Sequence, residues 1–259
     1  MNPPSVHTPV GALGNDGALS QGERRYLKSF LVLRLLVGVV GVGLTFALVY
    51  GERLLPGHQP LRGSLSGYYH SGVRDLFVGS LCAIAIFLIC YMMFHNVWDN
   101  VLSTLAGVAA LGVALLPTAG PDPGTPLQRW WGEALVGRLH FACAVVFILS
   151  LAAISVLFGY REGIKETSGA TRRLWWRSFH WACALLIVLS VVFVAVTKLT
   201  GRFDGHSVLY GEAAAAIAFG LSWLAKGSEW RILLAPSIRL DAPEPVPAYA
   251  EMVATASVR

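Results

Sequence analysis

Charged residues are scarce in this sequence: Asp, Glu, Lys and Arg make up 14% of its 259 residues, against roughly 25% in an average soluble protein. Apolar residues make up 55%, and the mean hydropathy is +0.59. Disordered and fibrous chains lack this much apolar surface, so the composition excludes them. It is typical of polytopic membrane proteins, whose helices are apolar toward lipid. We therefore predict an all-α membrane protein.

Cysteine is also rare, and each of the four cysteines lies within an apolar run, where it serves most simply as a small packing residue. No disulfide framework is expected. The sequence contains no nucleophile elbow, phosphate-binding glycine loop, H-E-x-x-H motif or dinucleotide fingerprint. Its 20 Lys and Arg residues are scattered along the ends of apolar runs, so we expect no nucleic-acid partner despite the net charge of +5.

Six apolar stretches are each close to the roughly 20 residues that cross a hydrocarbon core. They lie at approximately 29–50, 75–95, 100–118, 139–160, 178–198 and 209–226. We expect no cleavable signal peptide before them. The sequence predicts a bundle of six transmembrane helices over residues 28–227, between two cytoplasmic tails. The N-terminal tail comprises residues 1–27, and the Pro-containing C-terminal tail, residues 228–259, is expected to be flexible.

Lys and Arg residues beside the spans predict the orientation, because they resist translocation. A cytoplasmic N-terminus places more of these residues inside than outside. We therefore predict a multi-pass protein of the plasma (inner) membrane with both termini in the cytoplasm. The short stretch at residues 95–100 predicts an antiparallel hairpin of the second and third spans. The polar and aromatic loop at residues 51–74 is expected to fold against the outer mouth of the bundle.

The second, fourth and sixth spans all begin at the outer face in this topology, and each has ionisable residues near its start. Asp75 and Glu212 each share a helical face with small residues, which favours an inward orientation. Ionisable residues at membrane depth are candidates for function. The alternative is that the helix dipole stabilises each carboxylate, by roughly 0.3–1 kcal/mol, and that Arg74 is an interfacial anchor. We predict a ligand-binding site formed by five residues: Arg74, Asp75, His140, Glu212 and Tyr69.

An internal similarity links two spans, because His140 and Cys143 are repeated 40 residues later as His180 and Cys183. The H-x-x-C spacing is typical of half a zinc site. However, the two motifs begin helices of opposite direction, so they are expected near opposite membrane faces, too far apart to share a metal. The simpler interpretation is a pair of similar helices with small packing residues.

Several segments together resemble a family of uncharacterised bacterial six-helix integral membrane proteins. The resemblance covers most of residues 64–227 and implies the six-helix fold, but no activity. The positions it shares with the predicted site are Arg74, Asp75, His140 and Glu212. The resembling segments are residues 66–70 (SGYYH), 74–79 (RDLFVG), 105–107 (LAG), 114–118 (ALLPT), 139–147, 212 and 218–227 (AFGLSWLAKG).

A more distant resemblance is to the alkaline ceramidase-like superfamily of membrane hydrolases, which use histidine-held zinc with nearby Ser and Asp. This sequence offers Ser66, His70, Asp75 and His140. It departs from that pattern in having six predicted spans and no H-x-x-x-H pair in a late helix.

Two principal functions follow from these observations. The first is a membrane protein without a cofactor that binds a lipid, a small amphiphile or a partner membrane subunit at the outer polar site. The alternative is a zinc-dependent intramembrane hydrolase of lipid amides or esters, with His70, Asp75 and His140 as metal ligands. Two weaker possibilities are proton-coupled transport through the carboxylates and a b-type haem between paired histidines. Haem ligation requires His140 to pair with His70 or His206, or His180 with His95.

Overall fold

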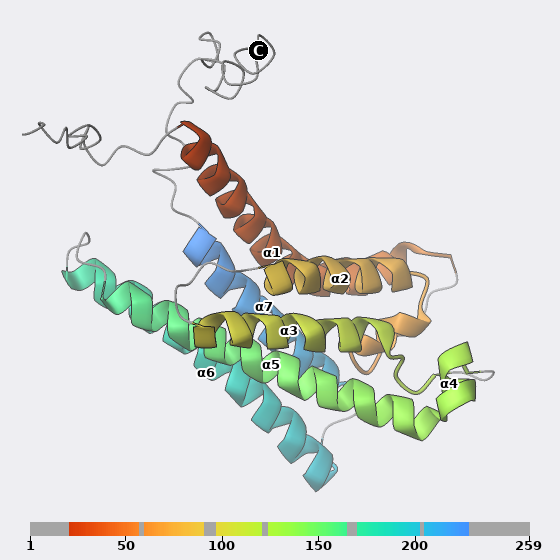
Figure 1. Cartoon of the computed structure of the whole chain (residues 1–259). Coiled ribbons are helices and arrows are strands. Elements are labelled where there is room, and N and C mark those ends of the chain that lie inside the picture. Colours follow the sequence, from red (N-terminus) through yellow and green to blue (C-terminus); the bar gives the residue numbers. More distant parts are fainter. Residues whose placement is uncertain are drawn as a thin grey trace, which may run out of the picture. The chain divides into compact units, whose positions relative to one another are not determined.

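A computed structural model of the chain describes residues 21–56, 60–90, 97–120, 124–164, 170–202 and 205–227. All the regular structure in these residues is helical, which confirms the predicted all-α class (Figure 1). The helices are α1 (Gln21–Leu54), η1 (Ser66–His70, a 3₁₀-helix), α2 (Arg74–Cys90), α3 (Val97–Leu115), α4 (Pro126–Trp131), α5 (Glu133–Gly163), α6 (Ala170–Thr200) and α7 (Ser207–Gly227).

The six predicted apolar stretches coincide with the six long helices, α1, α2, α3, α5, α6 and α7. Four of these helices are long and apolar enough to cross a membrane. They are Lys28–Leu54, Glu133–Gly163, Leu174–Thr200 and Ser207–Lys226. The apolar helices α2, with 17 residues, and Asn100–Leu115 within α3 are shorter. The structure therefore supports a membrane protein with four candidate spans, and the count of six stays a prediction.

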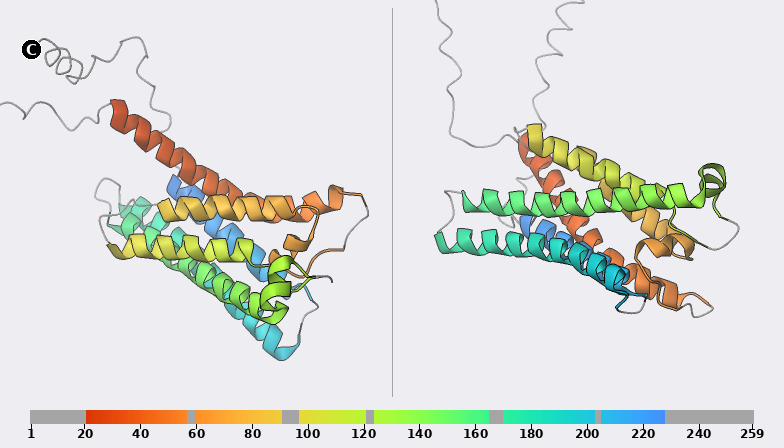
Figure 2. Two further views of the ribbon diagram at one scale, coloured as in Figure 1. Left: turned by 45° about the vertical axis from the view of Figure 1, so that its right-hand side comes forward. Right: turned by 90° about the horizontal axis from the view of Figure 1, so that it is seen from below.

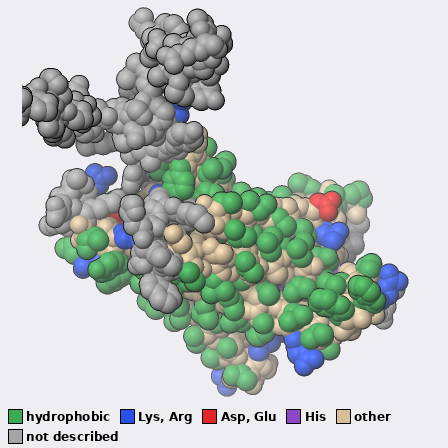
Figure 3. Space-filling model, in the orientation of Figure 1, with side chains coloured by type: hydrophobic (Ala, Val, Ile, Leu, Met, Phe, Trp, Pro, Cys, Tyr) green, Lys and Arg blue, Asp and Glu red, His purple; other side chains and the backbone are tan. Residues whose placement is uncertain are grey.

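The six long helices pack in a closed cycle, in the order α1, α2, α3, α5, α6 and α7, with α7 returning to α1 (Figure 2). Their inner faces form two apolar clusters, one around Phe158 and Trp223 and the other around Leu48 and Leu81. Many large apolar side chains instead point outward. Figure 3 shows them covering most of the visible helical surface, with Lys and Arg toward its edges. This distribution suits a lipid environment.

Close approach of α1 and α7 depends on glycine. A Cβ atom built on Gly220 would lie 2.8 Å from the carbonyl oxygen of Gly38, and one built on Gly41 would lie 3.0 Å from the Cα atom of Gly220. No larger residue fits there without moving a backbone. Gly38 and Gly41 of α1 are therefore packing residues, whereas a Cβ atom built on Gly43 would have nothing within 4 Å.

The loop between α1 and α2 folds against the start of α7. The amide of Leu209 donates to the carbonyl of Gly63 at 2.9 Å, and Nε2 of His206 donates to the carbonyl of Leu61 at 3.1 Å. The guanidinium of Arg62 forms an ion pair with Glu52, at the end of α1. The prediction that this loop packs on the bundle is thus confirmed. We call this end of the bundle, where α2, α5 and α7 begin, the η1 end.

Other predictions concern residues that the structure does not describe. The connection between α2 and α3, with His95, lies outside the described residues, and so do residues 1–20 and 228–259. The predicted N-terminal tail overlaps the fold, however, because α1 begins at Gln21 rather than at residue 28.

Candidate functional site

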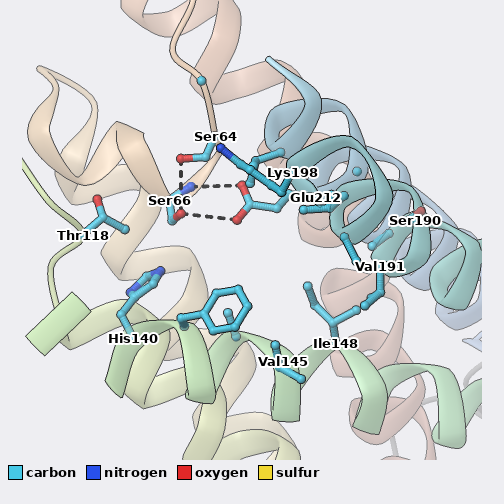
Figure 4. Close-up of a pocket in the computed structure, with 18 of the residues that line it drawn as sticks. Ser64, Ser66, Thr118, His140, Val145, Ile148, Ser190, Val191, Lys198 and Glu212 are labelled. Atoms are coloured by element: carbon cyan, nitrogen blue, oxygen red, sulfur yellow. Dashed lines mark hydrogen bonds between the residues drawn. The ribbon is translucent and has the colours of Figure 1, made fainter. Parts of the chain in front are cut away.

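A cavity of about 780 Å³ lies at the η1 end of the bundle, within the size range of small-molecule sites. Helices α5, α6 and α7 form most of its wall. The loop before η1 contributes Gly63 and Ser64, and η1 contributes its first residue, Ser66. Figure 4 shows these segments surrounding the opening.

The larger part of the wall is apolar. Helix α5 contributes Val145 and Ile148, and α6 contributes Val191, Val194 and Ala195. Both helices are candidate membrane spans. The apolar part of the cavity therefore lies between two lipid-facing helices.

Glu212 dominates the polar end, because its carboxylate accepts three hydrogen bonds from the loop. One donor is the amide of Leu65, at 2.6 Å. The other two are the amide of Ser66 at 3.4 Å and the hydroxyl of Ser66 at 3.3 Å (Figure 4). The first amides of a helix have no partner within the helix. Glu212, from the second turn of α7, thus supplies an acceptor at the N-terminus of η1. This contact between distant segments has no local sequence signal.

Ser64 completes this polar network. Its hydroxyl oxygen accepts from the amide of Gly67 at 2.9 Å and lies 3.3 Å from the hydroxyl of Ser66. Ser66 is buried, whereas Ser64 is partly exposed. The backbone of the loop is therefore held by Ser64 and Glu212, while both serines still line the cavity.

His140 lies on the opposite wall, two turns into α5, with 5% of its surface exposed. Its Nδ1 atom is 2.7 Å from the carbonyl oxygen of Leu116, just beyond the end of α3. A carbonyl oxygen only accepts, so Nδ1 carries the proton. In the neutral ring Nε2 is then an acceptor, on a side chain that lines the cavity.

Lys198 contributes a cation at the rim. It stands in the last turn of α6, is exposed, and makes no hydrogen bond or ion pair to other residues that the structure describes. Figure 4 shows its amino end pointing toward Ser64, beside Glu212. Lys198 is one of the Lys and Arg residues at the ends of apolar runs, and the sequence predicts no ligand contact for it. Lys198 is three residues from Ala195 and four from Val194, so the three residues share one helical face. This spacing is the only sequence signal that places Lys198 beside the cavity wall.

Only part of the predicted ligand site comes together. Glu212 and His140 line the same cavity, but Asp75 and Arg74 are exposed and are not among its lining residues. Arg74 instead donates to the hydroxyl of Tyr69 at 3.0 Å and covers that ring at 4.6 Å. The predicted inward orientation of Asp75 is therefore wrong, because this face of α2 points away from its neighbours in the first turn.

The three ligands of the zinc alternative are not brought together. His70 donates from Nε2 to the carbonyl of Thr118 at 2.8 Å, His140 is bonded to Leu116, and Asp75 is exposed. Among the described residues, no group of three or more His, Cys, Asp and Glu side chains has a metal-binding arrangement.

The histidines proposed as haem ligands also have other partners within the described part of the chain. His180 lies toward the opposite end of the bundle, 1% exposed, and its Nδ1 is 2.9 Å from the hydroxyl of Ser222. His206 is bonded to the loop carbonyl of Leu61. In the repeated H-x-x-C motif, Cys143 packs against Gly112 and Cys183 is buried, as expected of small packing residues.

This cavity thus joins a long apolar surface to a polar end that offers a cation, a hydroxyl and an imidazole acceptor. Such a surface binds molecules that are themselves apolar at one end and polar at the other. Comparison of the chain with known protein families, curated proteins and solved structures finds no match.

Proposed function

We propose that this protein is an integral membrane protein that binds a lipid or another small amphiphile in the cavity at the η1 end. The proposal takes all six long helices as membrane spans, with both termini in the cytoplasm and the η1 end at the outer face of the plasma membrane. The distribution of Lys and Arg favours this orientation.

The observation that carries the proposal is the segregation of the cavity wall. Polar side chains, among them Ser66, His140 and Glu212, gather where the loop meets α5 and α7. The remaining wall, along α5 and α6, is formed mainly by Val, Ile, Ala, Leu and Phe side chains. The one hydroxyl among these lining residues, that of Ser190, donates to the carbonyl of Leu186 at 2.7 Å. An amphiphile buries its chain against such a wall at roughly 25 cal/mol per Å² of apolar surface.

The mouth of the cavity also suits entry from the bilayer. Phe141 and Leu199 line it and expose 66% and 87% of their surfaces. Large apolar side chains that are this exposed on membrane-spanning helices contact lipid. A bilayer component therefore reaches the cavity between α5 and α6 without crossing an aqueous phase.

A steric block tests the proposal. Ala195 lines the cavity, whereas the next residue, Val196, is half exposed and does not. We expect Ala195→Trp to weaken binding of radiolabelled hexadecanol, a single-chain probe, at least about tenfold, because the indole fills the chain site. The protein is to be reconstituted in phosphatidylcholine nanodiscs, with binding measured by scintillation proximity.

Val196→Trp is the matched control, since it adds the same indole to the same turn of α6 but toward lipid. We expect it to change hexadecanol binding less than about twofold. Wild-type binding by the Ala195→Trp variant, or absence of hexadecanol binding by the unmodified protein, would exclude the cavity as an amphiphile site.

A further inference from the structure

We infer, on the basis of the function proposed above, that the ligand is a single-chain amphiphile with an anionic head group, a carboxylate or a phosphate monoester. Its head lies between Lys198 and Ser64, and its chain lies along α5 and α6. Three features carry this inference: the volume of the cavity, the cation at its rim and the hydrogen-bonding state of the nearby polar groups.

The volume limits the ligand to one chain. A water molecule takes about 30 Å³ of liquid volume, and if each non-hydrogen atom takes about as much, 780 Å³ holds roughly 25 such atoms. A head group with one long alkyl chain is of this size. A two-chain phospholipid has about twice as many atoms and does not fit inside the cavity, so its second chain would have to stay in the bilayer.

A smaller neighbouring cavity does not change this limit. It has a volume of about 90 Å³, lies among α1, α2, α3, α5 and α7, and shares Ser66, Ile148 and Glu212 with the larger one. At roughly 30 Å³ per atom it adds space for about three methylene groups. It can extend one chain toward the bundle interior, but it cannot hold a second one.

The charge of the head group follows from Lys198. Its ammonium group carries three donors and has no partner within the described residues. Glu212 is close by in the cavity wall, but its oxygens already accept three hydrogen bonds from Leu65 and Ser66. These neutral donors hold the carboxylate against the loop, and no hydrogen bond or ion pair joins it to Lys198 among the described residues. The three donors of the ammonium are therefore available to a ligand in the cavity.

Ser64 supplies a second donor. Its oxygen accepts from the amide of Gly67 and faces the hydroxyl of Ser66, whose proton points to Ser64 or Glu212. When Ser66 donates to Ser64, the proton of Ser64 is left for a ligand in the cavity. An anionic oxygen between Lys198 and Ser64 receives two donors, one of them charged, whereas a cationic head group is repelled by Lys198.

Binding of matched sixteen-carbon probes tests the inference. Hexadecanoate, hexadecyl phosphate and neutral hexadecanol share the chain and differ in the head. We expect Lys198→Ala to weaken binding of both anions about tenfold or more, since a charge-assisted hydrogen bond is lost. Hexadecanol binding is expected to change less than about twofold, and Lys198→Arg is expected to retain anion binding.

Arg202→Ala is the matched control, because Arg202 is an exposed cation four residues further along that does not line the cavity. It is expected to leave all three probes unaffected. Equal loss of hexadecanol and hexadecanoate in Lys198→Ala, or no loss of either, overturns the anionic head group. Loss of hexadecanoate in Arg202→Ala equal to that in Lys198→Ala also overturns it.

Competition with unlabelled molecules tests the single chain and the source of the anion. Dipalmitoyl phosphatidic acid and millimolar inorganic phosphate are both expected not to displace bound hexadecanoate. Displacement by the two-chain lipid refutes the single-chain limit, and displacement by phosphate alone shows a simple anion site. The Ala195→Trp variant separates these results from the proposed function: if it still blocks hexadecanol, the amphiphile cavity stands while the head-group inference falls.

Discussion

The two ends of the helical bundle use similar residues in different ways. At the η1 end, Glu212 and His140 bond to backbone groups of a loop and of a helix end, and Lys198 stands at the cavity rim. At the opposite end, Glu162 forms an ion pair with Lys226, and both side chains are largely buried. At the η1 end, polar side chains therefore line a cavity. At the opposite end, the two opposite charges of Glu162 and Lys226 are paired with each other inside the packed bundle.

The opposite end is built for packing. The rings of Phe158 and Trp223 are fully buried with centroids 5.3 Å apart, and the ring of His180 lies 5.8 Å from that of Phe158. Arg34 is 2% exposed, with its guanidinium carbon 5.7 Å from the Phe158 ring. Polar residues on these helices therefore lie inside the packing at one end of the bundle and line a cavity at the other.

Breaking the buried ion pair of Glu162 and Lys226 is expected to lower the free energy of unfolding more than any other change considered below. Glu162→Ala removes the carboxylate and leaves the ammonium of Lys226 buried, which costs about 3–5 kcal/mol in systems of this kind. The free energy of unfolding, measured by titration with dodecyl sulfate in mixed micelles, is expected to fall by that amount.

The double variant Glu162→Leu with Lys226→Met is the control, because apolar residues of similar volume remove the uncompensated charge. It is expected to recover most of the lost stability. A cost below about 1 kcal/mol for Glu162→Ala alone would mean that the pair does not organise this end of the bundle.

Removing the hydrogen bonds between Glu212 and the loop is expected to have an intermediate effect on stability. Glu212→Ala leaves the amides of Leu65 and Ser66 without their acceptor, at a cost of about 1–3 kcal/mol. Amide hydrogen exchange of Leu65 and Ser66 is expected to accelerate by more than tenfold, while exchange in the middle of α3 stays unchanged.

Glu212→Gln keeps one side-chain oxygen as an acceptor and provides the graded control for the loop. Its exchange rates at Leu65 and Ser66 are expected between those of the unmodified protein and those of Glu212→Ala. If Glu212→Ala accelerates exchange throughout α7 as well, the carboxylate supports the whole helix rather than the loop.

The helices were predictable from sequence because their signal is local. Four of the six predicted apolar stretches lie within a helix, and the stretches 75–95 and 100–118 extend beyond the last residues of α2 and α3. The loop before α2 packs on the bundle, as its polar and aromatic residues predict. The ends were less predictable. Helix α1 starts at Gln21, in a polar stretch where hydropathy carries no information.

Only part of the cavity lining could be predicted from the sequence, because the residues that line it are brought together by tertiary packing. His140 and Glu212 were identified from ionisable character at helix starts, a property of each span alone. Asp75 has the same character but is exposed, since the rotation of α2 is set by its neighbours. Lys198 stands at a helix end, where a membrane anchor and a ligand contact have the same local sequence.

The smallest expected effect belongs to the first of two glycines that are compared on the same helix, α5. A Cβ atom built on Gly137, which lines the cavity, has nothing within 4 Å. Gly137→Ala is therefore expected to raise the free energy of unfolding by about 0.5–1 kcal/mol, the helix propensity of Ala over Gly.

The same change at Gly159, toward the opposite end, is expected to have the opposite sign. A Cβ atom there would contact the Trp181 indole and lie 3.0 Å from the carbonyl oxygen of Arg177, so overpacking costs about 1–3 kcal/mol. The same dodecyl sulfate titration measures both variants. Two changes of equal sign would contradict the contrast between an open η1 end and a filled opposite end, because the helix and the substitution are the same and only the surroundings differ.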